Sequence, residues 1–305
     1  MYERYYGLQE RPFDLSPNPR FLCFTAQHHE ALVHLQYGLS GRPGVTMLVG
    51  EAGTGKTTLI RAALQAANGA STIVHLSNPT LSRGEFFDYL ADGFGFSAEA
   101  AKSKIQFLRE LERSLASDPS VLALVVDEAQ SVPYELLEEI RLLTNAEGPN
   151  GRTLAVALVG QPELARRLDE LPLRQLKQRV VLRCELTPLS LKDTAAYISA
   201  RVKTAGGEAT RLFSRDAVVA IHQHSMGIPR VISVIFDNAL VNGFAADQKP
   251  IGVSCVSEVC RALALPIQPQ QRTAEPVAET GREPVGAGTP APMFNSISRR
   301  RFSFF

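Results

Sequence analysis

The sequence predicts a doubly wound α/β fold followed by a smaller all-helical domain. Short apolar runs rich in Val, Leu and Ile alternate with stretches of helical periodicity, as in parallel sheets that helices cover on both faces. After Pro188 the apolar runs stop, and only amphipathic segments follow. A chain of 305 residues is long enough to hold both domains.

The elements are expected in a regular order. Prolines at 12, 17 and 19 predict that residues 1–24 form an irregular arm with aromatic anchors, and a helix is expected from Ala26 to about Leu39. The strands are expected at 45–50, 71–76, 121–127, 154–160 and 180–186. Helices are expected between them at 56–67, 82–117 (at least two), 133–144 and 162–178, and after them at 191–204, 214–224, 229–245 and 253–264.

These elements divide the chain into an arm with the first helix (1–44), an α/β core (45–190), a helical lid (191–265) and a tail (266–305). The tail is rich in Pro, Gly, Ala, Gln and Glu, so we expect it to be disordered. It ends in three arginines and three phenylalanines (299–305). This cluster either stays solvated or contacts anionic lipid, nucleic acid or a partner groove.

Composition excludes several classes of protein. A net charge of +1 argues against electrostatic capture of nucleic acid by the whole molecule, although a local basic patch is compatible with it. The apolar runs are too short to cross a bilayer, and the charged, aromatic N-terminus does not resemble a signal peptide. We therefore expect a cytoplasmic protein without an integral membrane segment.

Cysteine and histidine spacing fits no metal or disulfide framework. We expect four reduced, buried thiols, Cys23, Cys184, Cys255 and Cys260. His28, His29 and His34 lie close in sequence but lack partners at ligand spacing, so surface positions are expected for them.

A phosphate-binding loop follows the first strand. The residues from Gly50 to Thr58 match G-x-x-x-x-G-K-[ST] between a predicted strand and a predicted helix. Backbone N–H groups and the helix N-terminus would surround the phosphates of ATP, Lys56 would reach the β- and γ-phosphates, and Thr57 would ligate Mg²⁺. A dinucleotide fingerprint fits less well because it has no use for Lys56 and Thr57. The binding residues are Gly50, Glu51, Ala52, Gly53, Thr54, Gly55, Lys56, Thr57 and Thr58.

Two carboxylates end the third predicted strand. Asp127 is expected in the Mg²⁺ shell, and Glu128 is expected to orient or deprotonate the attacking water. The alternative is that both residues only cap the following helix.

These motifs resemble AAA+ ATPases over about 265 residues, and within them secretion ATPases of the ExeA/GspA type. Transposition target-selection ATPases of the MuB/TnsC kind share much of the core. The resemblance rests on Tyr5-Tyr6-Gly7-Leu8, Pro12-Phe13, Pro17, Pro19-Arg20-Phe21, His29-Glu30-Ala31-Leu32, GEAGTGKTT, VVDEAQ, LVGQPEL and GIPR.

The resemblance implies further roles. Gln161 would sense the γ-phosphate; the alternative is that it only starts a helix. Asn78 would restrain Glu128 until a partner binds; the alternative is that it only forms a turn before Pro79. Arg179, with Arg174 as its substitute, would reach a neighbouring subunit's nucleotide, unless it is simply solvated. Arg230 would contact the γ-phosphate from the lid. The arm from residue 12 to 21 would either approach the adenine or serve only as structure.

By the same resemblance, we expect an oligomeric ATPase that couples energy to, or assembles, a secretion or envelope-polysaccharide export system. ExeA-type proteins continue into a transmembrane helix and a peptidoglycan-binding domain, which this sequence lacks. The expected partners are therefore proteins of a membrane-associated export machinery, with the chain peripheral at the inner membrane. One alternative is a DNA-binding target-selection ATPase of a transposition system. Another is a signalling switch in which slow hydrolysis sets the duration of a protein interaction.

Overall fold

The computed structural model describes residues 1–14, 19–21, 25–41, 44–67, 71–117, 120–149 and 151–265. The chain divides into two units, Met1–Gln268 and Pro269–Phe305, and every described residue belongs to the first. The predicted tail and its terminal Arg/Phe cluster lie outside the described residues.

A five-stranded parallel sheet forms the centre of the α/β part. Its strands run in the order β2-β3-β4-β1-β5. They span β1 (Val45–Gly50), β2 (Ser71–Leu76), β3 (Val121–Val126), β4 (Ala155–Gly160) and β5 (Val180–Leu186). β1 and β4 are buried along their whole length, because helices cover both of their faces. The predicted strands are therefore confirmed, with β3 and β4 each one residue shorter than expected.

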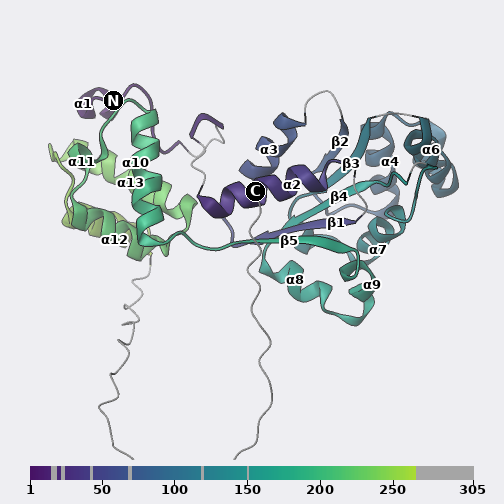
Figure 1. The fold of residues 1–305 in the computed structure, drawn as a ribbon. Coiled ribbons are helices and arrows are strands. Elements are labelled where there is room, and N and C mark those ends of the chain that lie inside the picture. The colour runs from purple at the N-terminus through teal and green to yellow at the C-terminus, as the bar shows by residue number, and fades with distance from the viewer. Residues whose placement is uncertain are drawn as a thin grey trace, which may run out of the picture. The chain divides into compact units, whose positions relative to one another are not determined.

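Helices cover the two faces of the sheet (Figure 1). Alternate strand residues point to opposite faces, so Leu124 joins one hydrophobic cluster and its neighbour Val125 joins the other. The Val125 face is covered by α2 (Ala26–Gly38) and α3 (Lys56–Ala66). The Leu124 face is covered by α4 (Arg83–Phe94), α5 (Ala98–Lys102), α6 (Lys104–Ser117), α7 (Tyr134–Leu143), α8 (Pro162–Leu168) and α9 (Arg174–Lys177).

Local signals explain where these helices begin and end. Ser82 caps α4 and forms a capping box with Glu85, and Gly95 ends that helix in the left-handed conformation. The single helix predicted over 162–178 is wrong. Pro172 lacks a backbone N–H and disfavours helical backbone at the preceding residue, so a short 3₁₀ turn, η3 (Leu171–Leu173), separates α8 from α9.

The helical part contains a separate hydrophobic cluster. Its helices are α10 (Leu191–Thr204), α11 (Ala209–Leu212), α12 (Arg215–Ser225), α13 (Pro229–Ala245) and α14 (Val253–Ala262), of which only the four-residue α11 was not predicted. No described helix is both long and apolar enough to cross a membrane. Cys184, Cys255 and Cys260 are free and buried, as predicted, whereas Cys23 lies outside the described residues.

The N-terminal arm packs into the cluster of the helical part. The expectation of a wholly irregular arm is wrong, because it contains α1 (Tyr2–Tyr6) and the 3₁₀ turn η1 (Pro19–Phe21). The Phe13 ring lies 4.1 Å from the Phe236 ring, and the Arg201 guanidinium lies over Phe13 and Phe21 at 5.2 and 5.3 Å. These contacts anchor the arm to α10 and α13.

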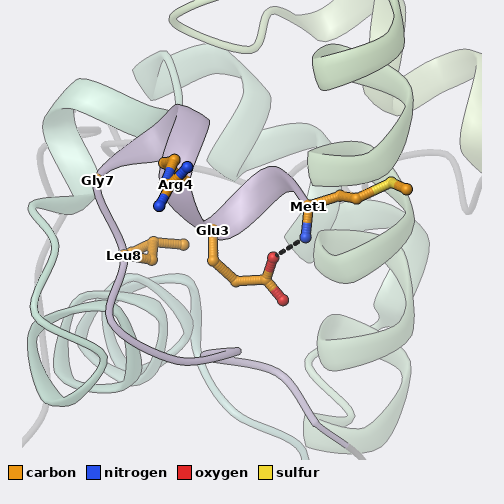
Figure 2. A pocket seen from close by; sticks show the side chains of 5 residues that line it. All are labelled: Met1, Glu3, Arg4, Gly7 and Leu8. Carbon is orange, nitrogen blue, oxygen red and sulfur yellow. Dashed lines mark hydrogen bonds and ion pairs between the residues drawn. The ribbon is translucent and has the colours of Figure 1, made fainter.

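A pocket opens beside α1, lined by Met1, Glu3, Arg4, Gly7 and Leu8 (Figure 2). The Glu3 carboxylate pairs with the N-terminal amine at 2.5 Å and with Arg11 at 3.0 Å. Its charge is therefore already balanced within the arm. The pocket shares no lining residue with the phosphate-binding loop, and we assign it no role.

Candidate nucleotide-binding site

The sheet topology brings the predicted site residues to one edge. Because the strands are parallel, their carboxyl ends meet at the same edge of the sheet. β4 lies between β1 and β3 in the sheet. Gln161, which follows β4, is therefore flanked by Gly50 at the end of β1 and by Asp127 directly after β3. This edge therefore collects the phosphate-binding loop, the acidic pair and the amide.

The loop between β1 and α3 has the backbone of a phosphate cradle. Gly53 and Gly55 have φ angles of +84° and +102°, which L side chains rarely adopt, and Gly55 is the N-cap of α3. The Thr54 hydroxyl donates to the Glu51 carbonyl at 2.8 Å and tightens the turn. The first N–H groups of α3 have no partner within the helix, so they and its dipole favour an anion here.

Lys56 is buried inside this loop. Its side chain is only 5% exposed, and its Nζ donates to the Gly50 carbonyl at 2.8 Å and the Glu51 carbonyl at 3.0 Å. Burial lowers the pKa of Lys56, while the nearby carboxylates of Glu128 and Asp127 oppose that shift. A buried ammonium bonded to two carbonyl oxygens suits a triphosphate, whose oxygens would place negative charge in direct contact with it.

Thr57 and Asp127 form the predicted metal pair. The Thr57 hydroxyl donates to Asp127 Oδ2 at 2.9 Å, and Asp127 is 4% exposed. Its other oxygen, Oδ1, accepts the backbone N–H of Glu128 at 2.9 Å. A hydroxyl and a carboxylate beside a phosphate cradle are the hard oxygen ligands that Mg²⁺ prefers, so the residues fit this ion.

Glu128 begins a sharp turn after β3. Its φ of +51° is unusual for a residue other than glycine, and it precedes the 3₁₀ turn η2 (Ala129–Ser131). Glu128 Oε2 accepts from Gln130 Nε2 at 2.6 Å and from Gln161 Nε2 at 3.5 Å. The structure therefore brings Glu128 and Gln161 together, as the sequence implied, and adds Gln130, to which sequence reasoning assigned no role.

Arg230 reaches the loop from the helical part. Pro229 occupies the first turn of α13, and the Arg230 backbone N–H donates to the Gly53 carbonyl at 3.2 Å. The guanidinium belongs to an exposed residue at a helix N-terminus, where a cation is unfavourable unless an anion lies nearby. This position is compatible with the implied contact to a γ-phosphate.

Arg179 lies at the opposite edge of the sheet. Its carbonyl accepts from the backbone N–H of Val45, the first residue of β1, and its exposed side chain donates to the Asn145 side chain. Arg174, its substitute, is exposed at the start of α9. Neither arginine joins the cluster around Lys56 within this protomer.

Asn78 is exposed two residues after β2. β2 pairs with β3, and the Asp127 N–H donates to the Leu76 carbonyl at 2.9 Å, so Asn78 follows the strand next to the acidic pair. Among the described residues, the hydrogen bonds found for the Glu128 carboxylate come from the two glutamines and not from Asn78.

The surface position predicted for His28 is wrong. His28 is 7% exposed, its Nε2 lies 3.0 Å from the Thr54 carbonyl oxygen, and its Nδ1 lies 2.7 Å from Thr25 Oγ1. Donation to the carbonyl requires the proton on Nε2, which leaves Nδ1 to accept from the Thr25 hydroxyl. The histidine thus holds the phosphate-binding loop from α2. Its only sequence signal is its place three residues after Thr25, which caps α2.

Comparison with known proteins agrees with this geometry. Residues 39–168 match the family described as "AAA domain". General secretion pathway protein A of Aeromonas hydrophila is 40% identical over 249 residues, which cover 80% of this chain and 45% of that protein. The chain therefore spans less than half the length of this relative.

Solved structures support the fold. The ORC2 protein of Aeropyrum pernix, in ADPNP and ADP complexes, aligns with a TM-score of 0.60 and 16% identity over 83% of this chain and 71% of its own. Drosophila ORC bound to DNA aligns with a TM-score of 0.59 and 19% identity over 84% of this chain and 65% of that one. At such identities the likeness concerns the fold alone. The AAA-domain match, the P-loop edge of the sheet and the similarity to the Aeromonas protein identify the chain as an AAA+ P-loop protein of the ExeA/GspA type.

Proposed function

We propose that the protein binds Mg-ATP at the edge formed by β1, β3 and β4 and hydrolyses it. The observation that carries this proposal is the buried Lys56 ammonium within the glycine loop, beside the bonded pair of Thr57 and Asp127. Lys56 and Arg230 would bind phosphate oxygens, and Thr57 and Asp127 would hold Mg²⁺. The ion, when bound, neutralises charge on the β- and γ-phosphates.

In this proposal Glu128 accepts a proton from the attacking water, which Gln161 helps to orient. The developing negative charge on the phosphoryl oxygens is stabilised by Lys56, by the N-terminus of α3 and by Arg230. Lys56 and the N-terminus of α3 are held by the protein before the nucleotide arrives, so these groups need little reorganisation during the reaction.

Two variants test the site. Lys56→Ala should abolish tight nucleotide binding, because the principal phosphate cation is lost. Glu128→Gln should retain nucleotide binding and stop turnover, because an amide cannot accept the proton. Fluorescent-nucleotide titration and phosphate release measure the two effects, with Lys192→Ala, an exposed lysine of α10, as the control. Normal hydrolysis by Glu128→Gln would exclude the assigned base.

The position of Arg179 supports an oligomeric enzyme. β1 separates Val45, which bonds to Arg179, from Gly50 at the phosphate loop, a span of about 16 Å at roughly 3.3 Å per residue. Arg179 is therefore remote from its own nucleotide, and its side chain is exposed where a neighbouring protomer could bring its nucleotide. An arginine inserted in this way accelerates phosphoryl transfer by about 10³–10⁵ in other P-loop enzymes.

Mixing experiments test the trans contact. Lys56→Ala cannot bind nucleotide, and Arg179→Ala cannot supply the arginine, so each alone should be inactive. In a mixture, Lys56→Ala protomers would supply Arg179 to nucleotide on Arg179→Ala protomers, and activity should return. Wild-type activity per protomer should also rise with protein concentration. If mixing restores no activity with Arg179→Ala but does restore it when Arg174→Ala takes its place, then Arg174 is the arginine that acts on the neighbouring protomer's nucleotide.

For the biological process, we propose an energy-coupling or assembly ATPase of a secretion or envelope-polysaccharide export system, acting in the cytoplasm or at the inner membrane through protein partners. The similarity to general secretion pathway protein A supports this, and the net charge of +1 weighs against tight DNA binding. A DNA mobility-shift assay with ATP at several salt concentrations separates the alternatives. Steep salt-dependent binding would favour transposition target selection over secretion.

A further inference from the structure

Gln130 is the described residue that bonds to both Glu128 and the backbone of Gln161. Its Nε2 donates to Glu128 Oε2 at 2.6 Å, and its Oε1 accepts the backbone N–H of Gln161 at 3.0 Å. A backbone N–H can only donate, so the amide must present its oxygen to Gln161 and its NH₂ to Glu128. The orientation of the side chain is thus determined by its surroundings.

The backbone on both sides of this amide leaves it little freedom. A Cβ on Gly160 would lie 2.6 Å from Gln130 Oε1, so the amide could keep this position only beside a glycine at the end of β4. The carbonyl of Gln130 accepts from the Arg167 guanidinium, which lies over the Tyr134 ring at 4.6 Å. Gln161, which follows β4, and Arg167 of α8 therefore both bond to Gln130.

Glu128 itself needs such support. It follows the buried β3 in a left-handed backbone conformation, and its side chain is only partly buried. A carboxylate in such a position can adopt several rotamers, and hydrogen bonds to one oxygen select among them. The second amide, Gln161 Nε2, contacts the same oxygen at 3.5 Å, which leaves Oε1 as the oxygen directed to other partners.

We propose that Gln130 is a positioning residue for hydrolysis: it holds Glu128 by Oε2 so that Oε1 meets the attacking water. This inference rests on the proposed role of Glu128 as the base. This role of Gln130 differs from the one that the resemblance implied for Asn78, which was to restrain Glu128 until a partner binds. A carboxylate displaced by about 1 Å can cost roughly 10²-fold in rate.

Two substitutions separate positioning from structure. Gln130→Met keeps the approximate shape and removes both hydrogen bonds. Gln130→Glu keeps an acceptor for the Gln161 N–H but removes the donor to Glu128 and adds a repelling charge. We expect both variants to lower kcat by about 10- to 100-fold with nucleotide affinity within about twofold of wild type. Gln178→Met, at an exposed glutamine after α9, is the matched control.

A double-variant cycle provides the decisive measurement. In the Glu128→Gln background, the slow residual hydrolysis should not fall further when Gln130→Met is added, because Gln130 acts only through the Glu128 carboxylate. Wild-type kcat in Gln130→Glu would mean that only the bond to Gln161 matters, and it would overturn the proposal. A rise in kcat in either Gln130 variant would also overturn it, as would losses that add in the double variant. Thermal unfolding monitors folding of each variant. If Glu128→Gln itself hydrolyses ATP normally, the role of Glu128 as the base fails instead.

Discussion

Replacing Gly53 by alanine tests whether the helical part is held against the phosphate-binding loop. Gly53 has a φ of +84°, and a Cβ there would lie 2.7 Å from Arg230 Cβ and 3.2 Å from Ile228 Cγ2. Carbon atoms in contact prefer about 3.5–4.0 Å, so the start of α13 would have to retreat by about 1 Å. Such a shift would lengthen the bond between the Arg230 N–H and the Gly53 carbonyl.

Two costs add in this variant. An L residue in the left-handed region costs about 1–2 kcal/mol, and overpacking typically costs a further 1–3 kcal/mol. Gly95→Ala isolates the first cost, because Gly95 has a φ of +70° and nothing lies within 4 Å of the added methyl group. We therefore expect Gly53→Ala to lower the free energy of unfolding by about 1–3 kcal/mol more than Gly95→Ala, and to weaken nucleotide binding about tenfold.

Urea denaturation measures the first difference, and titration with a fluorescent nucleotide measures the second. Arg230→Gly removes the Cβ that the new methyl group meets, so the double variant Gly53→Ala/Arg230→Gly should be more stable than the sum of the single changes implies. Equal losses of stability in Gly53→Ala and Gly95→Ala, together with additivity in the double variant, would refute the contact between α13 and the loop.

Other predictions concern buried side chains. His28→Phe should weaken nucleotide binding by about tenfold, because it leaves the Thr54 carbonyl unpaired, and His29→Phe at the exposed neighbouring position should have no effect in the same titration. Burial raises the pKa of Cys184 and of Cys260 to about 11, from an ordinary value of 9.0. Their contribution to stability should therefore be complete below pH 9 and lost as the pH rises through 11, as urea denaturation at each pH would show. Alkylation by iodoacetamide at pH 9 should be slow until the chain is unfolded; rapid labelling of both thiols in the folded protein would contradict their burial.

The sheet was predictable because its signals are local. β1 is a short, mainly apolar run that leads directly into the glycine loop, and burial on both faces leaves Thr46 as its one polar residue. The identities of Lys56, Thr57 and Asp127 follow from the same stretches, because strand ends carry site residues in open parallel sheets. These residues come together in the structure as the motifs imply.

Prediction failed where a side chain's role depends on a distant element. The sequence of α2 does not indicate which face of the helix is buried, so the burial of His28 was not predicted. Its ring reaches Thr54 because α2 packs beside the phosphate-binding loop. Gln130 bonds to Glu128 across a turn in which Glu128 has a left-handed backbone conformation, and no residue in the sequence predicts that conformation. The break between α8 and α9 had a visible signal in Pro172, but the helical periodicity of the flanking residues concealed it.

The site combines two kinds of support, and they should respond differently to perturbation. Lys56, Thr57 and Asp127 are held by backbone and side-chain bonds within the α/β part. Arg230 is joined to Gly53 through a single backbone hydrogen bond at the start of α13. A movement of α13 would therefore withdraw the arginine and leave the cradle intact. Nucleotide binding by the loop and completion of the charge shell are then separable events. Variants at the start of α13 should therefore alter kcat more than variants of α3 that spare Lys56, Thr57 and Thr58.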